Sequence, residues 1–391
     1  MKSIEQRLNV IKQHVDNNHI RIMILGLGSV GLYLLDYIIS CRDEDIEIIV
    51  VGRNDEKMQS DVNIVKVSSL IRGLNKSKVI VESGVDFDNI ESIQACFEKY
   101  QPDFVVNSSR VYSGLKYGSI SWNNLRAYGI WAPLAIKYVK NIMDACDKAD
   151  SNAIIINTSY SDAVIPWLKS AGKSYPDFGS GNVNHLIPRI KLAVAESEGI
   201  KDYWNIDVTF ATSHFHDVVI SKEGHTEGIE QLISIEYNNK KLEIDILAIF
   251  EKCKIAMPVD KKRNMMNASS NYEIIMSIIE AIRTRKKVKF HSPGALGYIG
   301  GYPVIVDGEN DNVCVCIDDS KFKLEDMINK NKESIYMDGI QSIENGTLFY
   351  TDELIEKVQK VFQVTLTKQV KYEDIQSVAE FLITEIIEKN K

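Results

Sequence analysis

Hydrophobic and polar residues follow two different periodicities along the first 160 positions of the chain. Short runs of consecutive apolar residues predict buried strands, and stretches in which apolar residues recur every three or four positions predict amphipathic helices. Strands are predicted at 22–26, 46–52, 78–83, 103–109 and 153–159, and helices at 4–16, 89–100 and 132–149. This alternation is typical of an α/β fold with a doubly wound parallel sheet that helices cover on both faces.

The alternation stops near residue 160, and longer, less regular segments follow. The elements predicted there are a helix at 187–198, a long strand at 205–220, a charged stretch at 221–263, a helix at 271–285, strands at 303–306 and 313–317, a helix at 323–335, a hairpin that turns at Asn345-Gly346 and a last helix at 371–388. We therefore expect an N-terminal helix (1–19), an α/β domain (20–160), a mixed α/β substrate domain (161–345) and a C-terminal helical extension (346–391).

Composition excludes several classes of protein. With 391 residues, 45% of them hydrophobic and 26% charged, the chain has the balance of a folded protein and not that of a disordered one. No uninterrupted apolar stretch reaches the ~18 residues of a membrane-spanning helix. The net charge of −8 disfavours nucleic acid as a partner. The six cysteines form no C-x-x-C pair, so neither a disulfide framework nor a metal site is expected. The first 19 residues lack the apolar core of a signal peptide, which favours the cytoplasm.

A glycine-rich turn joins the first strand to the helical pattern after it. Gly26-Leu27-Gly28-Ser29-Val30-Gly31 fits G-x-G-x-x-G in the strand-to-helix context that dinucleotide binding requires. The first glycine permits the tight turn, the second lets a pyrophosphate approach the backbone, and the third lets helix and strand pack closely. Gly26, Gly28, Ser29, Val30 and Gly31 are therefore predicted to bind a dinucleotide on a Rossmann domain.

The end of the second strand indicates which dinucleotide is bound. An acidic residue there would select NAD through the ribose 2′-hydroxyl, but this chain has Gly52-Arg53-Asn54. A guanidinium matches a 2′-phosphate in charge and geometry, so Arg53 and Asn54 favour NADP over NAD. In the alternative, Arg53 faces solvent or stacks on adenine while Asp55 serves NAD.

Beyond this motif the chain resembles the lactate/malate dehydrogenase family over roughly residues 20–340. The likeness rests on four segments: DFVVNSSR with the later NNLRAYGIWAPLAIKYV, which is similar to the mobile substrate loop; IIINTSYSDAVIPWLKSAG, similar to the strand ending in N-P-V-D; GSGNVNHLIPRIKLAVAESEGI, similar to the helix with a substrate-binding arginine; and IDVTFATSHFHD, similar to the strand that delivers the catalytic histidine. The resemblance implies hydride transfer between a nicotinamide and a carbonyl or alcohol carbon of a small metabolite, in a homo-oligomer such as a dimer.

The resemblance also implies roles for individual residues. His214, or else His216, would exchange the hydroxyl proton, Arg189 and Arg110 would hold a substrate carboxylate, and Asn107, Ser108 and Ser159 would lie beside the cofactor. In an extended strand both histidines face the same side, so either can reach a shared pocket. Residues 182–188 lack the acid that would orient the histidine. Either Asp217 or Asp177 replaces it, or the proton relay differs from that of the family.

Three other functions are compatible with the sequence. An extended short-chain reductase would need a Tyr-x-x-x-Lys helix, for which Tyr112 to Lys116 is the only suitable match. A saccharopine- or opine-type reductase would reduce an imine on a similar nucleotide domain. A non-catalytic NADP-binding sensor or scaffold would keep the fold without the chemistry.

Overall fold

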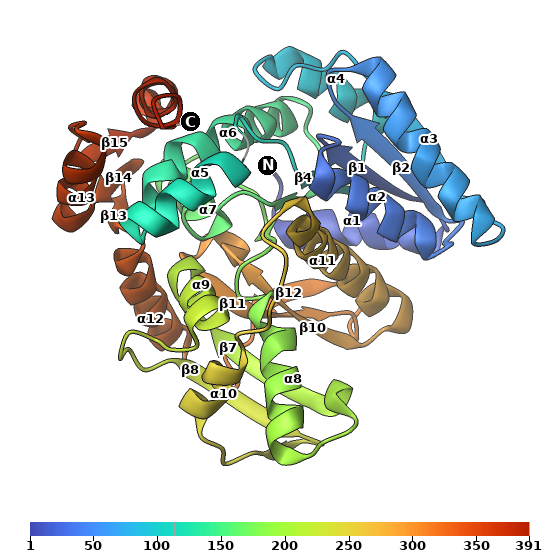
Figure 1. Ribbon diagram of the computed structural model, residues 1–391. Helices are drawn as coiled ribbons and strands as arrows, with labels where there is room; N and C mark the ends of the chain where they lie inside the picture. The colour runs from blue at the N-terminus through green and yellow to red at the C-terminus, as the bar shows by residue number, and fades with distance from the viewer. Residues whose placement is uncertain (113, 391) are drawn as a thin grey trace.

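The computed structural model describes residues 1–112 and 114–390, and its N-terminal part is built on a parallel sheet (Figure 1). The sheet has six strands in the order β3-β2-β1-β4-β5-β6. Its strands are β1 (Ile20–Leu25), β2 (Ile46–Val51), β3 (Lys78–Glu82), β4 (Phe104–Asn107), β5 (Ile154–Asn157) and β6 (Phe178–Gly179). All five neighbouring pairs are parallel. This is the doubly wound order of a Rossmann fold, so the predicted fold class is confirmed.

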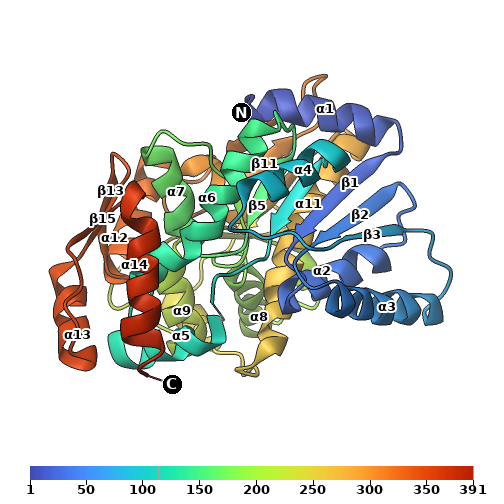
Figure 2. The same cartoon turned by 90° about the horizontal axis from the view of Figure 1, so that it is seen from above.

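Helices cover both faces of this sheet, because its central strands are apolar on both sides. In β1, Met23 and Leu25 face one hydrophobic core, while Ile22 and Ile24 face another. The first core contains α4 (Ile90–Tyr100), α6 (Ala132–Lys148) and α7 (Ser161–Ser170), and the second contains α1 (Ile4–Asp16), α2 (Ser29–Ser40), α3 (Asp55–Ile71) and α11 (Asn264–Thr284). Figure 2 shows the layers from above. Helix α11, which comes from the later part of the chain, therefore packs on the second face of the parallel sheet.

Three small antiparallel sheets follow. They consist of β7 (Ile206–Ala211), β8 (Leu232–Tyr237) and β9 (Lys240–Lys241); of β10 (Lys287–Pro293), β11 (Gly301–Asp307) and β12 (Cys314–Ile317); and of β13 (Ile340–Glu344), β14 (Thr347–Tyr350) and β15 (Gln369–Lys371). The helices among them are α8 (Leu186–Glu198), α9 (His214–Glu223), α10 (Ile246–Lys252), α12 (Leu324–Met337), α13 (Asp352–Phe362) and α14 (Ile375–Phe381). No helix within the described residues is long and apolar enough to cross a membrane.

Two expected domain boundaries fall inside structural units. Strand β6 lies after residue 160 but belongs to the parallel sheet. Asn345 and Gly346 both have positive φ and form the turn between β13 and β14, so the predicted hairpin is confirmed and residue 345 lies within it. The segment after 345 contributes two strands as well as helices.

The strand predicted over 205–220 is wrong in its second half. Strand β7 ends at Ala211, and His214 is the first residue of helix α9. Two contacts stop the extended run: the Gly301 N–H donates to the Thr212 carbonyl, and the His214 N–H donates to Oδ1 of Asp162 at 3.1 Å. The latter contact satisfies a backbone donor in the first turn of the helix. His214 and His216 consequently point in different directions.

Candidate active site

The glycine turn has the geometry that dinucleotide binding needs. Gly26 has φ +91°, and a Cβ on it would lie 3.0 Å from the backbone nitrogen of Ser109. A Cβ on Gly31 would lie 2.3 Å from the Gly26 carbonyl oxygen, so this position must stay bare for α2 to pack on β1. A Cβ on Gly28 would meet nothing within 4 Å, which leaves room for a phosphate at the N-terminus of α2.

A cavity of about 660 Å³ extends from this turn to helices α9 and α11. It lies at the carboxyl ends of the parallel strands, where doubly wound sheets bind their ligands. Of the cofactor residues predicted from the sequence, Gly26, Gly28, Ser29, Val30, Arg53, Asn54 and Ser108 line it. Among the described residues that line this cavity, Asp217 is the single carboxylate.

The end of the cavity beside β2 is basic. Arg53 and Lys57 line it, and Oδ1 of Asn54 accepts the Lys57 N–H at 2.9 Å to cap α3. Phe87 and Tyr138 line it too, with ring centroids 5.8 Å apart, and offer apolar faces to an adenine. Asp55, the acid of the NAD alternative, does not line the cavity.

Three of the predicted cofactor residues, Gly31, Asn107 and Ser159, do not line the cavity. Asn107 is buried, accepts the Ser109 N–H at 3.1 Å and donates to Oδ1 of Asn157, so its amide holds β4 and β5 together. Ser159 is buried, and its carbonyl accepts the amide of Asn157. Thr158 and Tyr160, on either side of Ser159, line the cavity instead. Asn107 and Ser159 are thus both buried and bonded inside the protein, and their placement beside a cofactor stays a prediction.

His214 lies at the other end of the cavity and forms a pair with a buried carboxylate. Its Nδ1 is 2.8 Å from Oδ2 of Asp338, which is fully buried where α12 ends. Asp338 also accepts the hydroxyl of Tyr160 at 2.7 Å and the N–H of Tyr128 at 2.7 Å. Because Nδ1 is bonded to Asp338, Nε2 is the ring nitrogen left for a ligand. This is the arrangement of a general acid–base histidine whose orientation and neutral tautomer are fixed by a carboxylate.

Aromatic rings and acids surround this imidazole. The ring centroids of Tyr128 and Tyr160 lie 4.7 and 5.4 Å from that of His214. Burial lowers the pKa of His214, but the nearby carboxylates, Asp338 first, outweigh it and leave the pKa above its ordinary value. Burial raises the pKa of Asp162 and of Asp217 to about 6 each. The site therefore keeps His214 protonated to a higher pH than free histidine.

His216 is a structural residue. Its Nε2 donates to the Thr226 carbonyl at 3.2 Å, so its Nδ1 accepts the Ser334 hydroxyl at 2.8 Å. Burial lowers its pKa to about 4, which keeps the ring neutral. It does not line the cavity. The expectation that it shares a pocket with His214 is wrong because the chain has turned into a helix there.

The two predicted substrate arginines lie in different surroundings. Arg189 is buried beneath the surface, where it donates to the carbonyls of Cys253 at 2.9 Å and Ile255 at 3.5 Å. It does not line the cavity, and its role as a carboxylate clamp stays a prediction that this placement does not favour. Arg110 does line the cavity, beside Tyr117 and Tyr128, and forms no ion pair with a carboxylate of the described chain.

Asp338 was missed because nothing local marks it. Of the acids expected to orient the histidine, Asp177 binds Arg7, at 2.8 Å to Nη1, and fastens α1 to the sheet. Asp217 lines the cavity but its Oδ1 has no hydrogen-bond partner. Asp338 lies 124 positions after His214, and its only sequence signal is that a glycine follows it at a helix end.

Tyr112 of the short-chain alternative lines the cavity, whereas Ser113 and the side chain of Lys116 lie outside what the structure describes.

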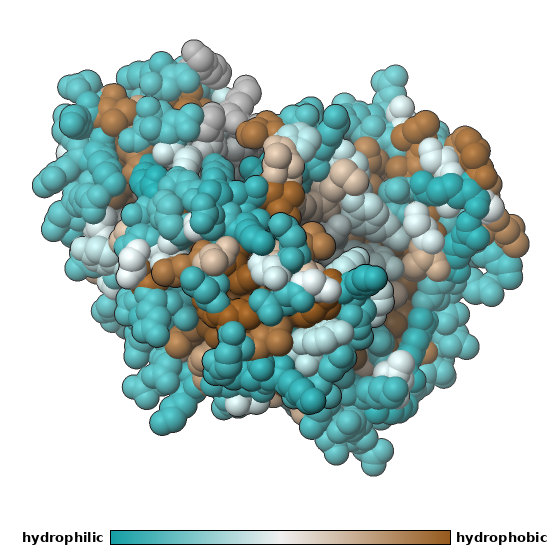
Figure 3. All heavy atoms as spheres, turned by 60° about the horizontal axis from the view of Figure 1, so that its bottom comes forward, coloured by the Kyte–Doolittle hydropathy of each residue, from teal (hydrophilic) through white to brown (hydrophobic). Residues whose placement is uncertain are grey.

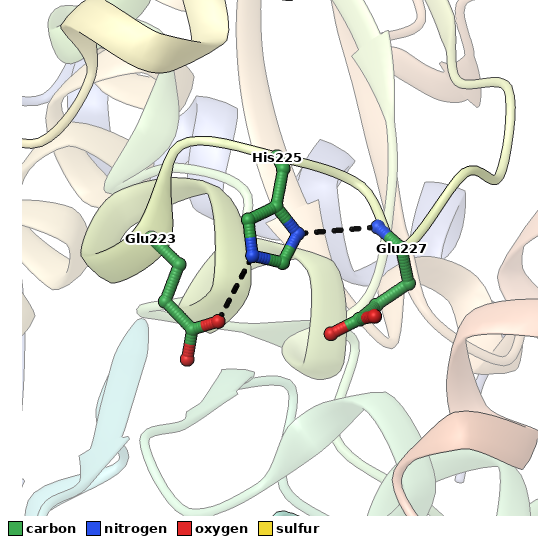
Figure 4. A group of neighbouring side chains, drawn as sticks. All are labelled: Glu223, His225 and Glu227. Carbon is green, nitrogen blue, oxygen red and sulfur yellow. Dashed lines mark hydrogen bonds and ion pairs between the residues drawn. The ribbon is translucent and has the colours of Figure 1, made fainter.

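An exposed group of acids with one histidine lies at the end of α9 (Figure 4). Nε2 of His225 is 3.0 Å from Oε2 of Glu223, and the Glu227 N–H donates to Nδ1 of His225 at 3.4 Å. The guanidinium of Arg126 already binds both carboxylates, at 2.6 Å from Oε2 of Glu223. We therefore assign this group to holding the Arg126 segment against α9.

Fold and site together define a Rossmann dinucleotide-binding fold with a second part that carries a histidine–carboxylate pair. The family model of the saccharopine dehydrogenase NADP binding domain matches residues 22–117. No match was found among the curated proteins.

The fold is also similar to solved dehydrogenase structures. Malate dehydrogenase of Cryptosporidium parvum is 16% identical with a TM-score of 0.52, over 81% of this chain and 96% of that one. Lactate dehydrogenase of the same organism, solved with lactic acid and nicotinamide adenine dinucleotide, is 13% identical with a TM-score of 0.52, over 82% and 97%. Malate dehydrogenase of Picrophilus torridus is 14% identical, also at 0.52, over 82% and 96%. The solved structures match the lactate/malate dehydrogenase resemblance, and the family model matches the saccharopine-type alternative, both of which the sequence indicated.

Proposed function

We propose that the protein is an NADP-preferring oxidoreductase that transfers a hydride between a nicotinamide and the carbonyl, alcohol or imine carbon of a small metabolite. The observation that carries the proposal is the His214–Asp338 pair, whose imidazole lines the same cavity as the glycine turn. A dinucleotide bound along the turn supplies the hydride chemistry. A proton donor at the far end of that cavity is what the other half of the reaction requires.

Each half of the reaction has its residues. In the reducing direction, protonated His214 gives its Nε2 proton to the substrate oxygen or nitrogen as the carbon accepts the hydride, and Asp338 stabilises the imidazolium until that moment. The Asp162 carboxylate fixes the backbone of His214. The rings of Tyr128 and Tyr160 exclude water from the imidazole. In the oxidising direction, neutral His214 takes the proton back.

Arg110 is the proposed anchor for the substrate. Its guanidinium lies among aromatic side chains, forms no ion pair with a carboxylate of residues 1–112 and 114–390, and lines the same cavity as His214. A substrate carboxylate would supply the missing charge with bidentate geometry. The proposed substrate class is therefore a carboxylate-bearing ketone or imine.

The test is NADPH binding by calorimetry, followed by NADPH oxidation with a panel of 2-oxo acids, their methyl esters, and imines formed from 2-oxo acids and amines. We expect turnover with one or more of the acids and a much higher KM for the matching ester, which lacks the charge that Arg110 binds. Tight NADPH binding without oxidation by the panel would favour the sensor function instead.

A cofactor-specificity prediction follows from Arg53. Replacing Arg53 with aspartate should shift the NADP/NAD ratio of kcat/KM toward NAD by tenfold or more, because a charge-assisted hydrogen bond of ~1.5–3 kcal/mol is lost and a repulsion is added. The matched control is Lys66→Asp, which makes the same charge change at an exposed site of α3 outside the cavity. An equal ratio in the Arg53 variant and the wild type would refute the role of Arg53.

We also propose that two copies of the chain associate through α3. Ile64, Val67 and Ile71 are 60%, 53% and 81% exposed, and Leu74 just beyond the helix is 74% exposed. Their spacing of three, four and three residues forms one stripe along the helix. Figure 3 shows hydrophobic side chains along its right-hand edge, the side on which α3 lies in Figure 1. The helix has Asp55 and Glu56 in its first turn and Arg72 as its C-cap residue, so an antiparallel pair brings Arg72 of each copy toward the acids of the other.

Light scattering during gel filtration tests this association. The wild type is expected to elute as a dimer at micromolar concentration, and Ile64→Glu/Ile71→Glu as a monomer, since the buried pair of helices would then contain four unpaired charges. Leu247→Glu is the control, because Leu247 is 64% exposed on α10. A wild-type monomer, or a double variant that stays dimeric, would exclude this interface.

A further inference from the structure

A basic segment from the second part of the chain lies against the glycine turn. Lys261 and Arg263 line the same cavity as Gly28 and Ser29. Directly after them, Nδ2 of Asn264 donates to Oγ of Ser29 at 2.6 Å, across 235 positions of sequence. Residues 261–263 form a single 3₁₀ turn, which the Asp260 side chain caps at its Lys262 N–H. The segment is therefore held in place from both ends.

Two helices begin at this point. Helix α2 starts after Gly28, and the 21-residue helix α11 starts after Arg263. Gly28 and Arg263 themselves cap neither helix through a side chain, and Asp260 caps only the 3₁₀ turn that precedes α11. The two helices pack against each other, and the Ser29–Asn264 contact joins their first residues. The positive ends of two helix dipoles thus meet on one side of the cavity, where they attract an anion.

The cationic side chains here lack the partners that other cations of this protein have. Arg126, Arg283 and Arg285 each form ion pairs with carboxylates. Over residues 1–112 and 114–390, neither Lys261 nor Arg263 forms an ion pair with a carboxylate within 4 Å. The cavity's own carboxylate, Asp217, has an unpartnered Oδ1. The segment therefore brings two cations without a carboxylate contact into the cavity, where Arg263 interacts with Asp217 only through space.

Polar atoms without partners mark the same wall. The Ser180 hydroxyl has no hydrogen-bond partner, although Ser180 is 4% exposed and lines the cavity. Nε2 of His185 is buried and unpartnered too. A Cβ on Gly181, between them in sequence, would lie 3.0 Å from Oδ1 of Asn267 in the first turn of α11. Buried polar groups are normally bonded, so these atoms point to a polar ligand that completes them.

We propose that Lys261, Arg263 and the first turn of α11 form the second half of the dinucleotide site and bind the pyrophosphate together with the glycine turn, beside which they lie. The ligand class is a diphosphate, whose two negative charges match the two cationic side chains and the two helix N-termini. The inference rests on the proposed cofactor. It adds that the cofactor is held by both parts of the chain, and that its phosphates tie α11 to α2.

Binding of defined fragments tests the inference. Calorimetry would compare the wild type, Lys261→Ala/Arg263→Ala and the control Lys262→Ala, whose residue lies within the same turn but does not line the cavity. The ligands are NADPH, NADH, ADP-ribose and adenosine 2′-monophosphate. The double variant should lose 10- to 100-fold in affinity for the three ligands that contain a pyrophosphate, because charge-assisted bonds to it are lost. Its affinity for the 2′-monophosphate should change less than threefold.

Each other result contradicts pyrophosphate binding by Lys261 and Arg263 in a different way. If the double variant and the wild type bind the pyrophosphate ligands equally, this inference is refuted, whereas the proposed function still holds as long as the wild type binds NADPH. If the double variant loses affinity for adenosine 2′-monophosphate as well as for NADPH, the segment binds the 2′-phosphate and not the pyrophosphate. If the double variant keeps its NADPH affinity but has a higher KM for the substrate, the segment binds the substrate instead. Absence of NADPH binding by the wild type would refute the proposed function itself. Arg263→Gln with an unchanged melting temperature provides the same comparison if the double variant is unstable.

Discussion

Replacing His214 with alanine is expected to lower kcat for NADPH oxidation by about 10²- to 10⁴-fold, the contribution that a positioned general acid makes. The affinity for NADPH should change less than threefold, because the glycine turn and Arg53 are at the other end of the cavity. Stopped-flow absorbance at the nicotinamide band, together with calorimetry, separates the two quantities. A loss of kcat without a loss of cofactor affinity identifies His214 as the proton donor.

His216→Gln is the matched control for this experiment. His216 is two positions away and buried, but its bonds go to Ser334 and Thr226 and not to the cavity. Its replacement should lower the free energy of unfolding by about 1–3 kcal/mol through the lost hydrogen bonds and leave kcat within about threefold. A large kcat effect at 216 and a small one at 214 would reverse the assignment.

Replacing Asp338 with asparagine is the second large-effect prediction, with kcat falling by about 10²-fold or more. The carboxylate raises the pKa of His214, so its removal lets burial lower that pKa. The reducing direction needs the protonated imidazole, and its rate falls as pH rises through the histidine pKa. The midpoint of this fall should therefore move to lower pH in Asp338→Asn, which a pH profile of kcat/KM measures.

Tyr160→Phe separates charge from hydrogen bonding at Asp338. It removes the hydroxyl bonded to Oδ2 but keeps the carboxylate beside His214. We expect a kcat loss of about tenfold and a midpoint close to that of the wild type, since the group that fixes the imidazolium remains. If Asp338→Asn and the wild type share one midpoint, Asp338 does not act through the protonation of His214.

The parts of the fold that were predicted from the sequence are those that local patterns specify. The strand–turn–helix around Gly26 and Gly31 needs only neighbouring residues, because the tight turn and the close packing of α2 lie within six positions. Arg53 and Asn54 after β2 were found in the same way, since their position follows from the motif. The Asn345-Gly346 hairpin is another local signal.

Predictions failed where distant contacts decide the local structure. The extended pattern before His214 stops because Gly301 and Asp162 bind the backbone on either side of Ser213. Arg189 is on the expected helix, but the carbonyls at 253 and 255 hold it away from the cavity. Lys261 and Arg263 belong to a stretch that reads only as charged and solvated, and their role depends on where α11 packs.

By itself the sequence determined a parallel α/β sheet, a glycine turn shaped for phosphates and a histidine on the later part of the chain. The tertiary structure alone decided which histidine reaches the cavity, which carboxylate it pairs with and which cations remain unpaired. The physical reason is the separation in sequence over which each kind of interaction acts. Steric demands of a turn and the periodicity of burial act between neighbours. The charge and hydrogen bonding of a buried side chain depend on groups anywhere in the chain, and Asp338 lies more than 100 positions from His214.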